Sequence, residues 1–337
     1  MILVTGGTGL VGAHLLYELA KDKKQVRAIY RPSSNLSTVR KVFSYFSLDH
    51  ETLFESIEWV EADITDVPSL ANAFQDVDYV YHCAALISFD ASKYRLHRKI
   101  NIEGTANVVN LCLLNKVKKL CYTSSIAAIG TTDNGLLIDE ETPWDPEAKN
   151  NVYAITKYGA EIEVWRGSQE GLDVVIVNPG LIIGAGFWHD GSGQLFTTIY
   201  KGMNFYTNGS VGFVDVRDVV AIMKKLMHSS IKNERYILVS ENLSYWEFMT
   251  EMANWSKVPP PVKEAKPWLL QLLWKMDWLA HTLFRRKRSF YKASAISATQ
   301  HALYDNQKII RDLNYSFRTV EESIEFVASK YITEKLV

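Results

Sequence analysis

The chain has 337 residues, enough to bury a large core and to form a main domain with a smaller lobe. Its composition, 47% hydrophobic and 22% charged residues, is that of a globular protein, and its net charge of -1 gives no electrostatic reason to expect nucleic acid as a partner. The three cysteines lack metal-ligand spacing, so we expect buried free thiols, a reducing cytoplasmic location and no metal site. No signal peptide is expected, because an apolar strand begins at Met1.

Strand-like apolar runs alternate with helical patterns through the first half of the chain. The predicted strands are Ile2–Thr5, Val26–Tyr30, Ile57–Glu61, Tyr79–Cys83, Lys119–Thr123 and Val174–Asn178, and the main helical patterns are His14–Ala20, Leu70–Phe74, Asn101–Asn115 and Tyr153–Gln169. This alternation predicts an α/β fold with a parallel sheet covered on both faces and with ligands at the carboxyl ends of the strands. After residue 180 the regularity fades, and six of the nine tryptophans lie there. We expect residues 212–227 and 235–240 to return to the main sheet.

Three glycines join the first strand to the first helix. Gly6 permits a tight turn, Gly9 permits close approach of a phosphate, and Gly12 permits the helix to pack closely on the strand. Because a strand precedes them and a helix follows, they predict that a dinucleotide pyrophosphate binds at the helix N-terminus. The predicted cofactor-binding residues of this segment are Gly6, Thr8, Gly9, Leu10, Val11 and Gly12.

The glycine pattern makes the fold prediction specific. We predict a Rossmann-type doubly wound parallel sheet with a smaller, mostly helical C-terminal substrate lobe. The NAD(P)-binding domain is expected to span residues 1–180 plus about 211–240, and the substrate-binding lobe about 181–210 plus 241–337.

The second strand ends at Arg31, where NAD-preferring sites carry an acidic residue that binds the ribose hydroxyls. A guanidinium binds a 2′-phosphate, whereas a carboxylate repels it. The sequence therefore favours NADP(H) over NAD(H), unless Arg31 is only a solvated residue at a strand end.

Tyr153 and Lys157 are four residues apart on a predicted helix, which places phenol and ammonium on one face. A nearby cation should lower the pKa of the tyrosine and suit it to exchange a proton with a substrate oxygen near neutral pH. The fifth strand ends in Thr123-Ser124-Ser125. We prefer Ser125 as the residue that orients the substrate oxygen, and a capping or turn role for Ser124.

These residues resemble the extended short-chain dehydrogenase/reductase family, also called the NAD-dependent epimerase/dehydratase family. The resemblance spans nearly the whole chain, because its motifs occur in the expected order. They are Thr5–Gly12, Asp63-Ile64, His82-Cys83-Ala84-Ala85, Asn101–Thr105, Ser125, Tyr153 with Lys157, Asn178-Pro179-Gly180, Phe213–Val219, and Asn306-x-Lys308 through Tyr315. Arg31 and the Asn-Pro-Gly triplet are most similar to the dihydroflavonol-reductase-like branch.

The resemblance implies roles for further residues. Asp63 and Ile64 would hold the adenine, Ala84 and Ala85 would lie beside the cofactor, and Lys157 would bind the nicotinamide ribose. Pro179 would border the nicotinamide. Asn101 is expected to order a water in the proton relay, and family members can be homodimers.

The sequence favours an NADP(H)-dependent reductase or dehydrogenase of a carbonyl/hydroxyl pair on a small, largely apolar substrate. Dehydration is disfavoured, because Ile126-Ala127-Ala128 follows Ser125 where nucleotide-sugar dehydratases carry acids. The alternatives are a nucleotide-sugar epimerase with tightly bound NAD and a cofactor-sensing binding protein without catalysis.

Residues 267–284 are apolar enough to be considered as a membrane span. Lys275, Asp277 and His281 near the middle argue against a span. We expect a mostly buried helix with a narrow polar stripe. The alternative is peripheral membrane contact through residues 267–288, since Arg285-Arg286-Lys287-Arg288 follows directly.

Overall fold

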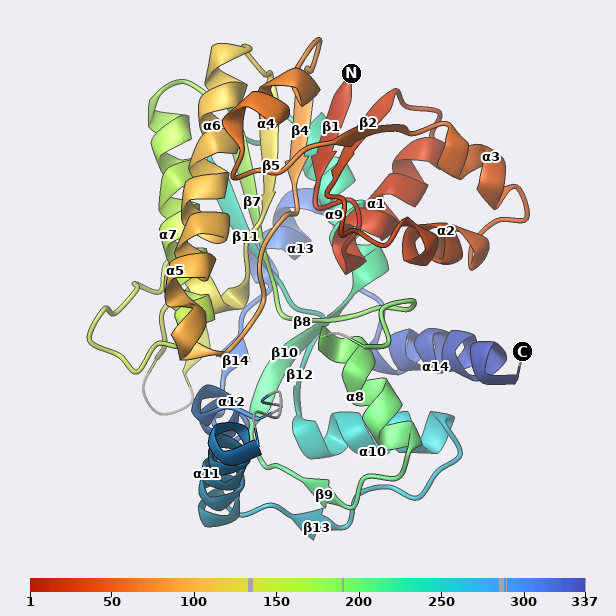
Figure 1. Cartoon of the computed structure of the whole chain (residues 1–337), viewed down its shortest axis with the longest axis vertical. Helices are drawn as coiled ribbons and strands as arrows, with labels where there is room; N and C mark the ends of the chain where they lie inside the picture. The colour runs from red at the N-terminus through yellow and green to blue at the C-terminus, as the bar shows by residue number, and fades with distance from the viewer. Residues whose placement is uncertain (133–135, 190, 285–287, 289, 337) are drawn as a thin grey trace.

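The computed structural model describes residues 1–132, 136–189, 191–284, 288 and 290–336, and its central feature is a seven-stranded parallel sheet (Figure 1). The strand order is β11-β7-β5-β4-β1-β2-β3. The strands are β1 (Ile2–Thr5), β2 (Val26–Tyr30), β3 (Glu58–Glu61), β4 (Tyr79–His82), β5 (Lys119–Thr123), β7 (Val174–Pro179) and β11 (Glu234–Leu238). The order reverses between β1 and β4, which is the switch point at which doubly wound sheets bind ligands. The predicted fold class is confirmed.

Helices cover both faces of this sheet. One face carries α1 (Leu10–Lys21), α2 (Leu36–Ser44), α3 (His50–Glu55) and α9 (Val216–His228), and the other carries α4 (Val67–Ala73), α6 (Gly104–Leu114) and α7 (Val152–Gln169). Strand residues alternate between the two cores, so that Ile2 and Val4 face α1 while Leu3 faces α6. This alternation explains why the strands read as continuous apolar runs.

The second lobe lies below the carboxyl ends of the strands (Figure 1). It contains a three-stranded sheet of β8 (Leu181–Ile183), β10 (Ser210–Asp215) and β12 (Glu241–Ser244), and a two-stranded sheet of β9 (Phe205–Tyr206) and β13 (Lys263–Glu264). Its helices are α8 (Gly191–Tyr200), α10 (Tyr245–Trp255), α11 (Pro267–Phe284), α12 (Lys292–Ser297) and α14 (Val320–Leu336).

The remaining elements connect these layers. They are β6 (Leu137–Ile138) paired with β14 (Leu303–Tyr304), α5 (Tyr94–His97), α13 (Gln307–Leu313), the 3-10 turns Ala91–Lys93 and Ile126–Ala128, and a π-helical turn at Arg98–Glu103.

Two sequence expectations need correction. The strand at residues 210–215 does not return to the main sheet, because β10 pairs in parallel with β8 and antiparallel with β12; only β11 returns. The second correction concerns residues 31–56, for which the sequence pattern did not predict a helix. There α2 is capped by Asn35, whose side chain accepts from two backbone N–H groups, and it buries Val39, Val42 and Phe43 on one face.

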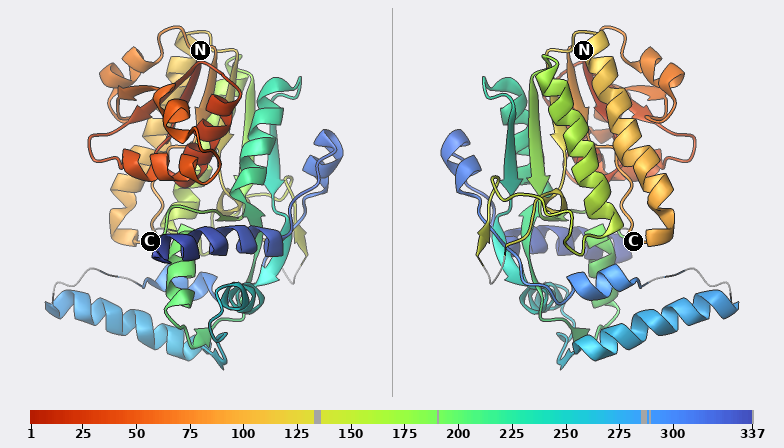
Figure 2. Two further views of the ribbon diagram at one scale, coloured as in Figure 1. Left: turned by 90° about the vertical axis from the view of Figure 1, so that its right-hand side faces the viewer. Right: turned by 90° about the vertical axis from the view of Figure 1, so that its left-hand side faces the viewer.

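The expectation of a mostly buried helix at residues 267–284 is also wrong. α11 forms as predicted, but Leu270 is its one buried residue in the described structure. In Figure 2 this light blue helix projects away from the rest of the lobe. Arg285, Arg286 and Lys287 lie outside the described residues, and Arg288 pairs with Asp277 at 3.6 Å. Within the described part of the chain, no helix is long and apolar enough to cross a membrane.

The three cysteines are free thiols, as predicted. Cys112 and Cys121 are buried, whereas Cys83 is half-buried. No group of three or more His, Cys, Asp or Glu residues that could hold a metal ion occurs among residues with a described placement.

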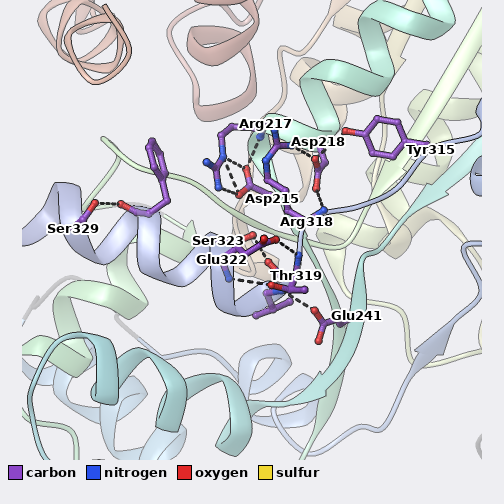
Figure 3. A network of polar contacts seen from close by, with 12 residues as sticks. Asp215, Arg217, Asp218, Glu241, Tyr315, Arg318, Thr319, Glu322, Ser323 and Ser329 are labelled. Atoms are coloured by element: carbon purple, nitrogen blue, oxygen red, sulfur yellow. Dashed lines mark hydrogen bonds and ion pairs between the residues drawn. The ribbon is translucent and has the colours of Figure 1, made fainter.

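The C-terminal segment is held to α9 by a buried carboxylate (Figure 3). Asp218, fully buried, accepts hydrogen bonds from the Tyr315 hydroxyl at 2.8 Å and from the Arg318 backbone N–H at 2.9 Å. The Arg318 guanidinium forms an ion pair with the same carboxylate. Asp218 therefore fixes the chain just before α14, which completes the second lobe.

Replacing Asp218 by Ala should lower the free energy of unfolding by about 3 kcal/mol, because Arg318 and Tyr315 lose their shared buried acceptor. Urea unfolding of the whole protein measures this change. Glu321→Ala, at an exposed position in the first turn of α14, serves as the control and should change stability by less than about 0.5 kcal/mol. Equal effects of the two variants would show that the Asp218 contacts do not hold the segment.

Candidate active site

The glycine turn has the close contacts that its sequence predicts. Gly6 has φ +69°, and a Cβ there would lie 2.5 Å from the backbone nitrogen of Ala84. A Cβ on Gly12 would lie 2.1 Å from the Gly6 carbonyl oxygen. Only glycine fits these two positions, which hold the ends of β1 and β4 and the start of α1 together.

The N-terminus of α1 fits an anionic ligand. Gly9 is the N-cap residue and provides no side-chain cap, and the first turn contains no acidic residue. A Cβ on Gly9 would approach only the Gly6 carbonyl oxygen, at 3.5 Å, so the space in front of this turn is open. Uncapped N–H groups and the helix dipole suit a pyrophosphate. Half-buried Thr8 and Leu10 and buried Val11 lie on the same turn.

Arg31 lies next to this turn at the end of β2. The Ser34 hydroxyl accepts from the Arg31 backbone N–H at 3.0 Å and from the Thr8 hydroxyl at 3.3 Å, which connects the two loops. The Arg31 side chain is exposed, and among the described residues its guanidinium has no hydrogen-bonded or ionic partner. A cation without a protein acceptor is therefore available for a ligand anion beside the glycine turn.

The residues that resemblance assigns to the rest of the cofactor line the same sheet edge. Asp63 follows β3 and accepts from the backbone and hydroxyl of Thr65, both at 2.8 Å, in a tight turn. The side chain of Ile64 is buried against Gly104. Ala84 is half-buried and Ala85 exposed after β4, whereas Pro179 is buried at the end of β7.

Ser125 and Tyr153 lie together at the end of β5. Ser125 is the N-cap of the Ile126–Ala128 turn, and its hydroxyl accepts from the Ala127 N–H at 3.1 Å. Tyr153, in the first turn of α7, is half-buried, and its ring packs edge-on against Phe89 with centroids 6.1 Å apart. Burial raises the pKa of Tyr153 to about 12, and a hydrogen bond with Ser125 opposes this rise.

Ser124 has a different role from its neighbour. Its hydroxyl donates to the Glu161 carboxylate at 2.6 Å, in the protein interior. The expectation that Ser124 caps a turn is therefore wrong, because Ser125 is the capping residue and Ser124 faces the other side of the strand.

Lys157 is almost completely buried and does not contact Tyr153 directly. Its ammonium donates to the Tyr122 hydroxyl and to the Thr123 carbonyl oxygen, both at 2.8 Å. Burial lowers the pKa of Lys157 to about 7, while the Glu161 carboxylate one helical turn away acts to raise it. The expected lowering of the Tyr153 pKa by Lys157 is wrong for this arrangement, because the ammonium is directed at β5.

A buried polar chain connects Lys157 with the strand of the glycine turn. The Thr5 hydroxyl contacts Nδ1 of His82 at 2.6 Å, and Nε2 of His82 contacts the Thr105 hydroxyl at 2.9 Å. Thr105 hydrogen-bonds Tyr122, which accepts from Lys157. Burial lowers the pKa of His82 to about 3, so the imidazole stays neutral at physiological pH. This series of buried polar contacts positions the Tyr122 hydroxyl, which in turn holds the Lys157 ammonium.

Asn101 serves the architecture of the cleft. It lies in the π-helical turn before α6, a feature often found at functional sites. Its side-chain oxygen accepts from the Leu86 N–H at 2.7 Å, and its amide donates to the Leu86 carbonyl and the Thr156 hydroxyl, both at 3.1 Å. These contacts hold the loop that follows β4. The role of Asn101 in ordering a water stays a prediction.

Glu161 is a buried residue of the site that is absent from the predicted set. Besides Ser124, it accepts from Asn178 at 2.9 Å and from Arg235 at 3.1 Å, and its side chain is 2% exposed. Its position four residues after Lys157 is the signal that could have identified it, because that spacing places both on one helix face.

Together, the sheet order and the glycine turn define a dinucleotide-binding α/β enzyme fold. The model of the "NAD dependent epimerase/dehydratase family" matches residues 2–238, so the chain belongs to that family. It is an NAD(P)-dependent oxidoreductase of the extended short-chain dehydrogenase/reductase type.

Similar proteins agree with this class. A Synechocystis protein whose name provisionally assigns it as a dihydroflavonol 4-reductase is 29% identical over 95% of this chain and 91% of its own length. Tetraketide alpha-pyrone reductase 2 of Arabidopsis thaliana is 30% identical over 74% of this chain and 80% of its own. The crystal structure of gox2253 superposes with a TM-score of 0.82 at 26% identity, covering 99% of this chain and 98% of that one.

Replacing Glu161 by Gln should lower the pKa of Lys157 further, because the carboxylate that favours the ammonium is removed. The ammonium is then lost at lower pH, so the alkaline limb of the pH profile of kcat/KM for NAD(P)-dependent turnover should move down by about one pH unit. Glu163→Gln is the control, because that carboxylate pairs with Arg166 on the other side of the helix. An unshifted profile in the Glu161 variant would contradict this positioning role.

Proposed function

We propose that the protein is an NADP(H)-dependent reductase or dehydrogenase that interconverts a carbonyl and a hydroxyl group on a small, largely apolar substrate. The observation that carries the proposal is the hydrogen-bonded pair of Ser125 and Tyr153 at the end of β5, beside buried Lys157. When bound, the nicotinamide supplies or accepts a hydride at the substrate carbon.

Tyr153 is the proton donor for a carbonyl substrate. A pKa near 12 keeps the phenol protonated at neutral pH, which is the form needed to protonate a developing alkoxide. The Ser125 hydroxyl orients the substrate oxygen toward the phenol. Lys157 holds positive charge behind both residues, where it stabilises negative charge that develops on the oxygen.

A cavity lined by Asn151 and Val152, the two residues directly before Tyr153, is the proposed substrate site. It has a volume of about 360 Å³ and lies between the loop after β4, the start of α7, and α11 and α12. Phe89, which packs on the Tyr153 ring, forms one wall, and Trp274, Tyr291 and Ile296 contribute apolar surface on the other side. Polar side chains such as Asn150, Lys292 and Gln300 also line it, so the cavity suits a small molecule with a largely apolar body and a polar group.

A second cavity, of about 390 Å³, lies behind α7 and suits the proposal less well. Glu140, Glu141 and Glu161 line it together with Arg235. This charged lining suits a largely apolar substrate less well than the lining of the first cavity does.

NADP(H) is the proposed cofactor because of the charge at the end of β2. Exposed Arg31 is tied through Ser34 to the glycine turn, and no acid occupies the position at which NAD-preferring sites carry one. Cytoplasmic location, the cofactor-domain boundaries at residues 1–180 and about 211–240, and a homodimer are further parts of this proposal.

An epimerase is the second candidate, because the matching family includes epimerases and a serine, tyrosine and lysine suffice for that reaction. The relatives at 29% and 30% identity are named as reductases, which favours the first proposal. A cofactor-sensing binding protein is disfavoured, because such a protein has no need of the buried contacts that hold Lys157.

Replacing Tyr153 by Phe should lower kcat for NADPH-dependent carbonyl reduction by about 100-fold or more, because the proton donor is removed. NADPH oxidation with a panel of aldehydes and ketones measures the rate, and NADPH affinity should stay unchanged. Tyr158→Phe is the control, because Tyr158 stacks on Trp144 with centroids 4.5 Å apart. Undiminished turnover in the Tyr153 variant would refute the assignment, and bound NAD with no net NADPH oxidation by the parent would favour the epimerase.

Replacing Arg31 by Ala should weaken NADPH binding by about tenfold or more and leave NADH binding unchanged, because a charge-assisted contact with the 2′-phosphate is lost. Isothermal titration with each cofactor measures the two affinities. Arg40→Ala is the control, since that guanidinium pairs with Glu51 at the surface. Equal affinities of the parent for NADPH and NADH would overturn the cofactor assignment.

A further inference from the structure

The helix α11 exposes a continuous apolar stripe. Its members and their exposed fractions are Trp268 (65%), Leu272 (46%), Met276 (57%), Leu279 (49%) and Leu283 (64%). Spacings of four, four, three and four residues place these side chains on one face of a helix that is about 27 Å long. Contiguous apolar surface on this scale marks an interaction site, because it is costly to leave in water.

The opposite face of the helix is already used for packing. Leu270 and partly buried Trp274 contact a small core that includes Ala295 of α12 and Phe290. The indole of Trp274 donates to the side-chain oxygen of Gln271 at 2.7 Å. The lobe thus holds α11 by one side, and Figure 2 shows the helix projecting from the body of the molecule.

The sequence that contains α11 is rich in basic residues. The sequence from Lys263 to Lys292 contains eight Lys and Arg residues and two acids, whereas the whole chain has a net charge of -1. Lys275 is exposed beside the stripe, and its aliphatic stem can lie along apolar surface while the ammonium stays in water. The partner that fits is therefore both apolar and anionic.

We propose that α11 binds the surface of an anionic phospholipid membrane, with the stripe inserted between the acyl chains and the cations at the headgroups. Tryptophans at positions 268 and 278 suit the boundary between headgroups and acyl chains. A second copy of the chain fits less well as the partner. Its own α11 segment is equally basic, so it would bring cations rather than the anions that this segment needs.

The position of α11 connects the membrane with the substrate cavity, a consequence that rests on the proposed function. Trp274, on the packed face of the helix, lines the same cavity as Phe89, which contacts the Tyr153 ring. An apolar substrate dissolved in the bilayer would therefore reach the site along the base of α11. The substrate class that follows is a membrane-soluble carbonyl or hydroxyl compound.

Flotation of the full chain with vesicles tests the proposal. The protein should float with phosphatidylglycerol–phosphatidylcholine vesicles, float less with pure phosphatidylcholine, and lose binding as salt is raised. The double variant Leu279→Glu/Leu283→Glu should lose at least about 100-fold in affinity for the anionic vesicles, because two carboxylates replace inserted side chains. Leu48→Glu/Leu114→Glu, at exposed leucines in the turn between α2 and α3 and at the end of α6, is the matched control and should float as the parent does.

Three outcomes would overturn the proposal: a parent that floats with neither vesicle, a Leu279/Leu283 variant that floats like the parent, or a parent dimer that the variant dissolves in sedimentation experiments without any vesicle binding. Reduction of a water-soluble carbonyl compound is measured on the same samples. The variant should retain that rate, since both substitutions lie away from the cavity. Flotation without any carbonyl reduction would refute the proposed function and leave the membrane contact standing.

Discussion

The candidate active site depends on the burial of one charge. Lys157 is almost completely removed from water, and a buried ammonium is destabilising unless hydrogen-bond acceptors surround it. The acceptors come from β5, in the Tyr122 hydroxyl and the Thr123 carbonyl, and the Glu161 carboxylate lies one helical turn further along α7. Glu161 also accepts hydrogen bonds from Ser124, which directly follows β5, from Asn178 of β7 and from Arg235 of β11. Lys157 and Glu161 together therefore fix α7 against three strands of the sheet.

The same burial gives the two titratable partners different protonation states. Desolvation raises the pKa of Tyr153 to about 12 and lowers that of Lys157 to about 7, because it penalises the charged form of each group. At neutral pH the phenol is thus a proton donor, while the ammonium is close to its midpoint. The lowered pKa of Lys157 also makes the folding stability depend on pH. Lys157 binds fewer protons in the folded than in the unfolded chain between pH 7 and its ordinary pKa of 10.5, so its burial penalty is full at low pH and declines as the pH rises through that window.

The sequence predicted the features that rest on local rules. Gly6 and Gly12 could be assigned because a strand–turn–helix of this spacing leaves no room for a side chain: a Cβ would lie 2.5 Å from a backbone atom at Gly6 and 2.1 Å at Gly12. The strands of the main sheet could be assigned because both of their faces are buried. The spacing of Tyr153 and Lys157 placed them on one helix, yet it could not show where the ammonium is directed. That direction depends on Tyr122 and Thr123, which only the packing of α7 on β5 brings within reach.

Features set by long-range packing were the ones missed or mistaken. The residue pattern of 210–215 is compatible with pairing to the main sheet or to β8, because a strand is buried in either sheet. The composition of α11 is that of a core helix, and its exposure follows from the absence of a covering element on that side among the described residues. Apolar composition alone cannot separate a buried helix from one whose partner is not part of the chain.

The two halves of the site depend on different parts of the chain. The matched family region, residues 2–238, contains the glycine turn, Ser125, Tyr153 and Lys157, and it ends at the last residue of β11. The residues of the cavity wall that come from α11 and α12 lie beyond it. The proposed proton donor and the glycine turn therefore lie in the part of the chain that matches the family, whereas one wall of the proposed substrate cavity comes from a lobe outside that match. Substitutions at Trp274 or Ile296 can change the shape of the cavity without touching the network around Lys157, so substrate specificity is free to diverge while the chemistry stays the same.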